Sequence, residues 1–422
     1  IIAIVRNLGP ASGPVRAHLT VPAGVRVLDG AVKTSDGVDF NGTEQFEWTI
    51  RASRPVSGQA KVAVSGEGFA SAESTLTLKF TPLPKLPRAD YVPPPRPVKP
   101  RYLTLMHYCP LWKAGTHYGW ERIEDWPDRR PAIGWYDEGT PEVADWHIKY
   151  ALEHGVQGFI YCWYRSDFSP EIHVTLGHAL HDGLLKARYV DMFNFTIMWE
   201  NGCAKGVQST NDMMQNVLPY WIKNYFKHPS YVKLDNKPVL FVWRPERVAP
   251  EVGGSAAVRE MFDKMREACR REGFDGLYIV GCVGSADEGL LKRMAKEGWD
   301  ASSAYGIDSP SAAPPTMDAE GVWVTDHRAT MEGQTRTLEA KKAIGALPDI
   351  VDIMMGWDPR PWHGANTQSY RANPSPENFR EACLRARALI EKTPGNGLDK
   401  RIVVFDNWNE FGEGHYLEPC TG

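Results

Sequence analysis

The 422-residue sequence lacks long hydrophobic runs, blocks of like charge and paired cysteines. No stretch approaches the roughly 18 consecutive apolar residues of a membrane-spanning helix, so we expect no membrane span. The 48 Lys+Arg nearly balance the 52 Asp+Glu, for a net charge of −4 without long runs of one sign, which argues against a nucleic-acid partner. The seven cysteines form no CxxC pair, so we expect neither a structural zinc site nor a disulfide framework.

Motifs of several other enzyme classes are missing too. No GxGxxG follows the first strand expected in the large domain, which disfavours a nucleotide-binding Rossmann sheet. No HxH or HExxH spacing supports metal-dependent hydrolysis, so we predict no metal and no cofactor. The first residues show no charged segment or cleavage site of a signal peptide.

The patterns that are present divide the chain into three parts. Residues 1–82 alternate apolar and polar side chains in short runs between Gly, Pro, Asn and Asp clusters, which predicts a small immunoglobulin-like β-sandwich. Residues 83–100 are rich in proline, which favours an extended linker. Residues 101–422 alternate apolar strands with helix-period segments, as βα units do.

Eight apolar segments of the large domain are expected to form parallel strands, with seven helices between them. This pattern fits a closed (β/α)8 TIM barrel better than an open doubly wound sheet. The strands are expected at residues 102–108, 158–163, 193–199, 238–243, 277–283, 300–305, 351–356 and 402–408. The helices are expected at residues 141–154, 174–187, 212–226, 256–271, 287–297, 334–346 and 375–391.

The active site of such a barrel lies where the strands end, because the βα loops meet there. Here nearly every strand ends in an aromatic residue followed by a polar one. Sugar rings stack their C–H faces on aromatic planes and bind polar groups through their hydroxyls, so we predict a glycan substrate. The predicted substrate-binding residues are Tyr108, Trp163, Tyr164, Trp199, Glu200, Asn201, Arg244, Tyr305, Trp357, Trp362, His363, Trp408, Asn409 and His415.

Glu410 and Glu413 follow the last expected strand, three residues apart. A helical turn there would bring both carboxyl groups to one side. Glycoside cleavage needs one carboxylic acid to protonate the leaving oxygen and a second group as nucleophile or base. Such a pair pushes its two pKa values apart, which keeps one proton in the site. Two Glu residues three positions apart are common on solvated helices. The hypothesis therefore rests on the position of this pair at the barrel mouth.

The segment Asn409-Glu410-Phe411-Gly412-Glu413-Gly414, followed by Glu418-Pro419, resembles a known signature. It is similar to Asn-Glu-Trp-His-Glu-Gly-Thr…Glu-Pro of glycoside hydrolase family 99, the endo-α-mannosidases, and of the related WbsX-like proteins. The resemblance covers residues 101–419 and implies a hydrolase that cleaves an α-linked glycan with retention. It implies that Glu410 deprotonates the substrate's own 2-hydroxyl and that Glu413 is general acid and then base.

The same resemblance places Tyr108, Trp163, Glu200 and Tyr305 at the subsites nearest the cleaved bond. The motif departs from the family where Phe411, Gly412 and His415 replace Trp, His and Thr. We therefore expect a differently shaped subsite, and mannan specificity does not follow.

Other functions stay open as alternatives. A glycosyltransferase of the WbsX type would need a nucleotide or lipid-phosphate donor, and no Asp-x-Asp clamp or phosphate-binding Gly loop is present. A polysaccharide lyase acting at the same mouth would need a base, for which Tyr305, His363 and His415 are candidates. A purely sugar-binding barrel would not require two adjacent carboxylates. We expect a periplasmic or secreted location, since polymeric glycans lie outside the cytoplasm.

Overall fold

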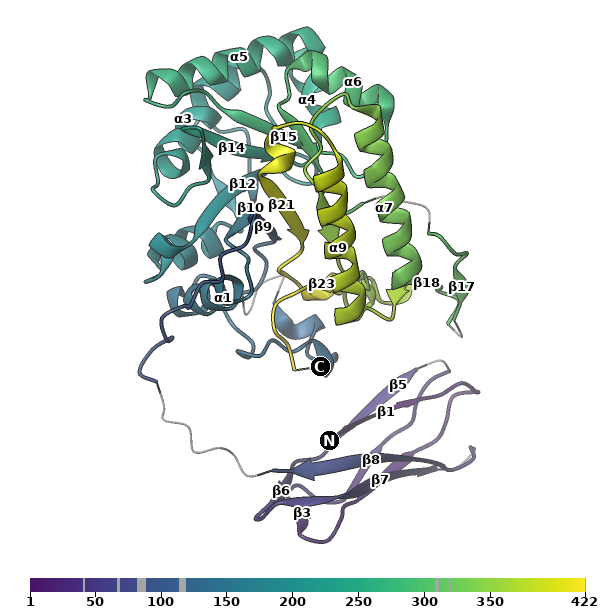
Figure 1. Ribbon diagram of the computed structural model, residues 1–422. Coiled ribbons are helices and arrows are strands. Elements are labelled where there is room, and N and C mark those ends of the chain that lie inside the picture. Colours follow the sequence, from purple (N-terminus) through teal and green to yellow (C-terminus); the bar gives the residue numbers. More distant parts are fainter. Residues whose placement is uncertain are drawn as a thin grey trace. The chain divides into compact units, whose positions relative to one another are not determined.

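The computed structural model describes residues 1–40, 42–66, 69–81, 89–113, 119–307, 311–318 and 320–421. The chain divides into two compact units, Ile1–Arg88 and Ala89–Gly422 (Figure 1). The first part of the predicted linker lies outside the described residues. Residues 89–100 have neither helix nor strand and pack on the second unit, where the Tyr91 hydroxyl donates to Asp145 at 2.6 Å. In the described part of the chain, no helix combines the length and apolarity that crossing a membrane requires.

The N-terminal unit is all β. Its strands are β1 (Ile2–Arg6), β2 (Val15–Thr20), β3 (Val25–Val27), β4 (Val32–Ser35), β5 (Thr43–Glu47), β6 (Ile50–Ala52), β7 (Val56–Gly66) and β8 (Ala72–Phe80). They pair antiparallel in one sheet of order β4-β2-β7-β8 and in the pairs β1-β5 and β3-β6. Every second side chain of β2 is buried, and these meet Phe46 and Trp48 in a common core. The predicted all-β domain is therefore present.

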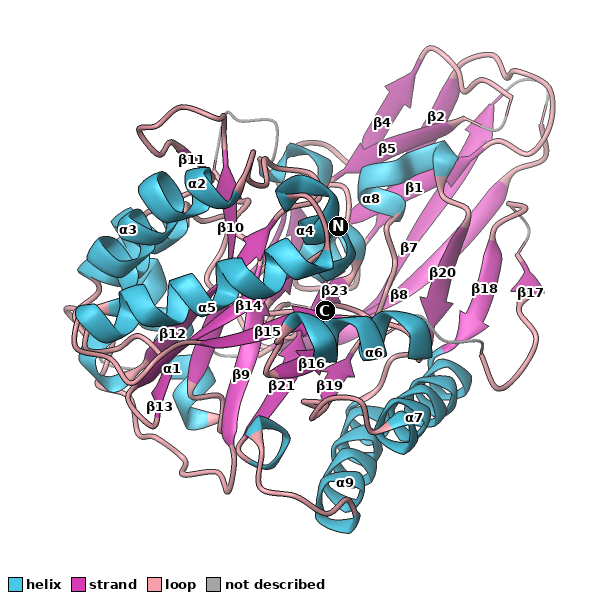
Figure 2. Cartoon of the chain, turned by 90° about the horizontal axis from the view of Figure 1, so that it is seen from above, coloured by secondary structure: helices cyan, strands magenta, loops and turns pink. Residues whose placement is uncertain are grey.

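The second unit contains a nearly closed parallel barrel (Figure 2). Its strands are β9 (Leu103–Tyr108), β10 (Gly158–Arg165), β12 (Asn194–Glu200), β14 (Lys237–Val242), β15 (Tyr278–Cys282), β16 (Ala301–Ser303), β19 (Asp352–Met354) and β21 (Ile402–Asp406). Their order is β16-β15-β14-β12-β10-β9-β21-β19, and a single parallel bridge between Ser302 and Asp349 joins the two ends. All eight predicted strands are present, which confirms the barrel.

The two faces of each barrel strand have different neighbours. On β10, Phe159, Tyr161 and Trp163 pack against the helices, whereas Ile160 and Cys162 point into the barrel interior. Successive side chains of a strand point to opposite faces, so this alternation continues to the strand end. The position of a residue along its strand therefore decides whether it can reach the barrel mouth.

Helices cover the outside of the barrel. They are α1 (Pro141–Glu153), α4 (Pro245–Val252), α5 (Ser255–Arg271), α6 (Glu288–Glu297), α7 (His327–Ile344), α8 (Arg360–His363) and α9 (Pro376–Lys392). Residues 210–226 form one helical stretch made of α2 (Thr210–Asp212), η6 (Met213–Val217), α3 (Leu218–Trp221) and η7 (Ile222–Phe226), of which η6 and η7 are π-helical. Helix α9 begins where Ser375 accepts from the Asn378 amide and Pro376 takes the first turn, as predicted. Helices α7 and α9 lie side by side (Figure 1).

One helix prediction is partly wrong. Instead of starting a helix at residue 174, Val174–Thr175 forms β11, which pairs antiparallel with the end of β10. The helical turns start only at Ala179, as η3 (Ala179–Gly183) and η4 (Leu184–Lys186). The ladder to Tyr164 and Arg165 overrides the weak helical periodicity, because tertiary pairing outweighs local propensity.

A small sheet escaped prediction. It consists of β17 (Thr316–Met317), β18 (Trp323–Asp326) and β20 (Ser369–Ala372), in that order. Strands of two to four residues are too short to give a periodic signal. This sheet follows β16 and β19 in the chain, and its residues form the outer wall of the cavity described below.

A buried ion pair lies where the ends of the barrel meet. The Lys341 ammonium of α7 is 2.7 Å from the carboxylate of Asp349 and donates to the carbonyls of Val283 and Ser303 at 2.8 and 3.1 Å. The Lys341 and Asp349 side chains are 2% and 1% exposed. Because both charges are removed from water, each depends on the other.

We predict that Lys341→Met strongly destabilises the protein. The substitution leaves Asp349 buried without its partner, which costs about 3–5 kcal/mol. Urea unfolding followed by circular dichroism would measure the change. As a control, Lys292→Met breaks an exposed pair with Glu288 and should cost less than about 0.5 kcal/mol. Equal effects of the two substitutions would contradict a structural role for the buried pair.

Candidate active site

A cavity of about 670 Å³ lies at the C-terminal ends of the barrel strands. One side is formed by the ends of β10, β12, β14 and β19, and the other by β18 and β20. The described residues that line it are Cys162, Tyr164, Met198, Glu200, Cys203, Trp243, Tyr305, Gly306, Ile307, Ser311, Thr325, Thr330, Met354, Trp357, Ser369, Tyr370, Arg371, Glu410, Glu413 and His415. Aromatic rings and a few polar groups together make this a ligand pocket of ordinary composition.

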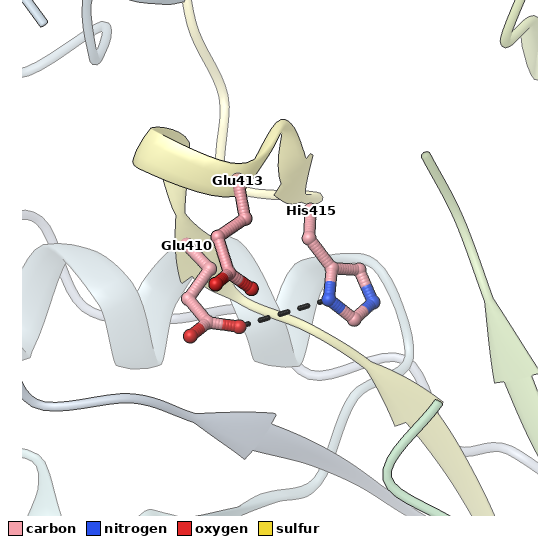
Figure 3. A group of neighbouring side chains, drawn as sticks. All are labelled: Glu410, Glu413 and His415. Carbon is pink, nitrogen blue, oxygen red and sulfur yellow. Dashed lines mark ion pairs between the residues drawn. The ribbon is translucent and has the colours of Figure 1, made fainter. Parts of the chain in front are cut away.

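Glu410, Glu413 and His415 converge at the base of this cavity (Figure 3). They lie on β22 (Asn409–Glu410), the 3₁₀ turn η10 (Phe411–Glu413) and β23 (His415–Tyr416), and β22 and β23 pair so that Glu410 faces His415. One polar atom of each side chain lies within 4.8 Å of the other two. The hairpin requires Gly414, whose φ of 59° is left-handed and which has no room for a Cβ beside Asp358.

Hydrogen-bond donors surround the Glu410 carboxylate. The Tyr305 hydroxyl donates to Oε2 at 2.8 Å, and Asn407 Nδ2 donates to the same oxygen at 3.0 Å. Asn407 also donates to the Tyr305 hydroxyl oxygen at 2.9 Å, which fixes both donors. These two hydrogen bonds fix the orientation of the Glu410 carboxyl group in the cavity.

The neighbouring Glu413 lies in different surroundings. Burial and the negative charge of Glu410 raise the pKa of Glu413 to about 9. Its carboxyl group is consequently protonated at neutral pH. A protonated acid beside an ionised carboxylate is the division of roles that general acid catalysis uses.

Asn409 anchors this hairpin to the barrel. Its side-chain oxygen accepts from the Cys109 amide at 3.0 Å, and its Nδ2 donates to the Cys109 carbonyl at 2.8 Å and to Glu138 at 2.5 Å. Further along the same motif, Glu418 accepts a hydrogen bond from the Tyr136 hydroxyl at 2.6 Å. Asn409 and Glu418 are fully buried. These two motif residues hold the loop in place and do not line the cavity.

Five of the fourteen predicted substrate-binding residues line the cavity, and the other nine do not. The predicted residues that line the cavity are Tyr164, Glu200, Tyr305, Trp357 and His415, together with Glu410 and Glu413. Glu200 is held by its own loop, since its carboxylate accepts from the amides of Gly202, Cys203 and Ala204.

Four predicted stacking residues do not reach the cavity. Tyr108, Trp163, Trp199 and Trp408 are at most 3% exposed and pack between the strands and the helices. The register explains this correction: Trp163 pairs with Trp199 on the outer face, and the next pair, Tyr164 with Glu200, points inward. These four side chains are core residues with no surface for a sugar ring.

The remaining predicted residues also lie away from the cavity lining. Asn201 is buried and exchanges hydrogen bonds with the backbone of Arg244 at 2.8 and 2.9 Å. The Arg244 side chain is half exposed and lies over the Trp243 ring. Trp362 packs near Trp112, and His363 is exposed on α8.

Several cavity residues were missed by the sequence reasoning. Trp243 could have been predicted at the end of its strand. Its side chain belongs to the alternating positions that point inward, whereas Arg244 belongs to those that point outward. Tyr370 and Arg371 could not have been predicted, since the small sheet that carries them gave no signal. Asn407 does not line the cavity and lies two residues before the predicted motif; its role depends on the hydrogen bond to Tyr305, which no local pattern predicts.

The Glu410, Glu413 and His415 group also has the atom types and spacing that could hold a metal ion. Metal binding would require Glu413 to be ionised. We interpret the group as acid–base machinery because Glu410 accepts hydrogen bonds from Tyr305 and Asn407. The prediction of no metal and no cofactor stays a prediction.

Residues 126–422 match the protein family whose description is glycosyltransferase WbsX. The chain belongs to the WbsX family. This confirms the resemblance inferred from the motif around Glu410. An uncharacterised protein, WxcX of Xanthomonas campestris pv. campestris, is 24% identical over 310 residues, which cover 69% of this chain. The chain spans only 41% of the length of that relative.

Among solved structures, this WbsX-family chain is similar to the glycoside hydrolase family 99 endo-α-mannosidase of Bacteroides thetaiotaomicron. The match has a TM-score of 0.50 and 17% identity, and covers 76% of this chain and 87% of that one. A second structure of that enzyme gives the same TM-score over 75% of this chain. At this identity the likeness establishes the barrel fold.

We predict that Glu413 carries its proton through neutral pH. In wild type its carboxyl signal should titrate near pH 9, and in Glu410→Gln the pKa of Glu413 should fall because the neighbouring charge is gone while burial remains. Carbon NMR of ¹³C-glutamate-labelled protein would follow both titrations. Ionisation of Glu413 below pH 6 in wild type would contradict its assignment as an acid.

Proposed function

We propose that this WbsX-family barrel is a glycoside hydrolase that cleaves an α-linked glycan with retention. The observation that carries the proposal is the pairing of Glu413, whose pKa is raised to about 9, with Glu410, which accepts two hydrogen bonds. The substrate class is supported by the barrel neighbour, which is named as an endo-α-mannosidase. The bound sugar would contact Tyr164, Trp243 and Trp357, the aromatic residues of the cavity wall.

In this mechanism Glu413 donates its proton to the departing glycosidic oxygen. Glu410 removes the proton of the substrate's 2-hydroxyl, whose oxygen then closes on the anomeric carbon. In the second step Glu413, now ionised, takes a proton from the water that attacks the anomeric carbon, and Glu410 returns its proton to the 2-oxygen as the ring opens. The nearest atoms of the two carboxyl groups lie within 4.8 Å of each other, which disfavours inversion, whereas the anhydro-sugar route sets no such separation. Inverting pairs are about 6.5–9.5 Å apart, because a water must fit between acid and base.

A glycosyltransferase is the second candidate, and the description of the family favours it. The residues of the cavity are compatible with hydrolysis and with transfer, since an acceptor hydroxyl can replace water as the nucleophile. Incubation of the protein with α-glycans in water, and separately with sugar nucleotides and acceptor glycans, distinguishes the two. New reducing ends support hydrolysis, and extension of the acceptor supports transfer.

We predict that Glu410→Gln and Glu413→Gln each lower kcat/KM by at least about 10²-fold, because each removes an essential proton-transfer group. Reducing-end release from a panel of bacterial, yeast and plant α-glycans would measure the loss. Glu260→Gln, on the exposed face of α5, is the matched control and should retain full activity.

A substrate with a different leaving group distinguishes the roles of Glu410 and Glu413. A glycosyl fluoride of the sugar found in the panel needs no proton to leave, so the deficit of Glu413→Gln should shrink on that substrate while that of Glu410→Gln persists. Equal deficits on both substrates would contradict the assignment of Glu413 as the acid, and unimpaired cleavage by either variant would refute the proposal.

Three further predictions accompany this proposal. The N-terminal unit would be an immunoglobulin-like module. The protein would act in the periplasm or outside the cell, where polymeric glycans lie. The lyase alternative would use the same cavity with Tyr305 or His415 as base, and unsaturated products in the same glycan panel would reveal it.

A further inference from the structure

His415 lines the cavity, but the mechanism proposed for Glu410 and Glu413 gives it no role. Its side chain is 2% exposed, its Nδ1 lies 3.6 Å from Glu410 Oε2, and its Nε2 lies 3.5 Å from Asp406 Oδ2 (Figure 3). Neither ring nitrogen has a hydrogen-bond partner of standard geometry among the described residues. The carboxyl groups of Asp406 and Glu410 are the two ion-pair partners within 4.0 Å of the ring, and that of Glu413 lies within 4.8 Å.

Asp406 presents the complementary problem. It is the last residue of β21, its side chain is 0% exposed, and neither carboxyl oxygen has a hydrogen-bond partner of standard geometry in the described part of the chain. A buried carboxyl group and a buried imidazole are each strongly unfavourable without partners. Placed side by side, they can satisfy one another, and separations of this size commonly shorten when a substrate closes the site.

We propose that Asp406, His415 and Glu410 form a hydrogen-bonded chain that sets the state of Glu410. Asp406 and His415 together hold two protons, one between Asp406 and Nε2 of His415 and one on Nδ1, the nitrogen that faces Glu410. His415 donates this N–H to Glu410 and holds its carboxylate oriented and ionised. Both His415 and Asp406 are thus positioning residues that act through Glu410, and this role rests on the hydrolase function proposed above.

The arrangement does not depend on which of Asp406 and His415 holds the shared proton. The pair must carry two protons, because an ionised Asp406 beside a neutral ring would hold the ring proton on Nε2 and leave Nδ1 bare. Burial raises the pKa of Asp406 well above its usual value, which favours an Asp406 that is protonated and donates to Nε2 while the neutral ring keeps its own proton on Nδ1. An imidazolium beside an ionised Asp406 has protons at the same two nitrogens. An imidazole fixed by a buried carboxylate on one side, so that its other nitrogen serves a reacting group, is a general catalytic device. His415 occupies the position at which the family signature has Thr, so the hydrogen-bonded chain of Asp406, His415 and Glu410 is not part of that signature.

The electrostatic surroundings of His415 agree with this geometry. Burial lowers the pKa of His415, but the carboxyl groups of Asp406 and Glu410 outweigh burial and raise it above the usual value. The groups that face the ring are Asp406 of β21, Glu410 of β22, Glu413 of η10, Arg371 of β20, His107 of β9, and the rings of Tyr305 and Trp357. Arg371 opposes the protonation of His415, and the two carboxylates favour it.

The first experiment reads the ring directly and needs no substrate. Nitrogen NMR of ¹⁵N-histidine-labelled full-length protein would follow His415, identified by its absence from His415→Gln. We expect a proton on Nδ1 across neutral pH, and Asp406→Asn should lower the pKa of His415 by about 1–3 pH units. A His415 ring that titrates identically in wild type and Asp406→Asn would overturn the proposal.

A surface pair provides the matched control. His173 Nδ1 lies 3.0 Å from Asp167, and the two side chains are 52% and 51% exposed. Asp167→Asn should lower the pKa of His173, which this carboxylate raises, and leave both His415 and the activity unchanged.

The second experiment uses the pH dependence of kcat/KM. Without the donor, Glu410 ionises less readily, so His415→Gln and Asp406→Asn should move the acidic limb of the profile to higher pH. At pH 6 we expect a loss of about 10–10²-fold, mostly in kcat, that shrinks as the pH rises. The amide nitrogen of His415→Asn can take the place of Nδ1, so this variant should keep more activity than His415→Gln.

The outcomes separate the two proposals. A loss of rate with an unchanged pH profile, and no advantage of Asn over Gln at position 415, would make His415 a structural residue only. If wild type cleaves no glycan, the proposed hydrolase function fails, while the NMR titration still decides whether the Asp406–His415–Glu410 chain exists.

Discussion

The two-residue period of the barrel strands is the constraint on which the rest of the site depends. Alternate positions along each strand point to opposite faces, and residues paired across neighbouring parallel strands point to the same face. In β10 and β12 this rule sends the pair Trp163 and Trp199 into the helix layer and the pair Tyr164 and Glu200 into the cavity. One residue of displacement along a strand therefore exchanges a core side chain for a ligand-binding one.

The hairpin after β21 converts this scaffold into a chemical site. Buried hydrogen bonds from Asn409 and Glu418 hold it against the barrel, and the left-handed Gly414 returns the chain so that His415 lies opposite Glu410. Rigid support of this kind is what acid–base catalysis needs, because a small displacement of a proton donor is costly in rate. The motif thus combines residues that react with residues that only hold them.

Glu410 and Glu413 have the same side chain, but their different surroundings in the cavity suit them to different chemical roles. Glu410 is surrounded by donors from Tyr305 and Asn407, whereas burial and the adjacent charge dominate at Glu413. The same division of labour would serve a hydrolase or a transferase, since both must protonate a leaving oxygen. The description of the WbsX family and the chemistry of the site are therefore compatible, and the nucleophile that enters the cavity decides between them.

The sequence by itself determined the order and number of the barrel strands, the all-β N-terminal unit, and the position of Glu410 and Glu413 after the last strand. These features are local, since apolar periodicity and turn residues act over a few neighbours. Tertiary structure alone decided which face Tyr108 and Trp408 occupy, that the small sheet carrying Arg371 completes the cavity, and that Asp406 meets His415. Each of these depends on register or on contacts between segments far apart in the chain, where burial and pairing override any local signal.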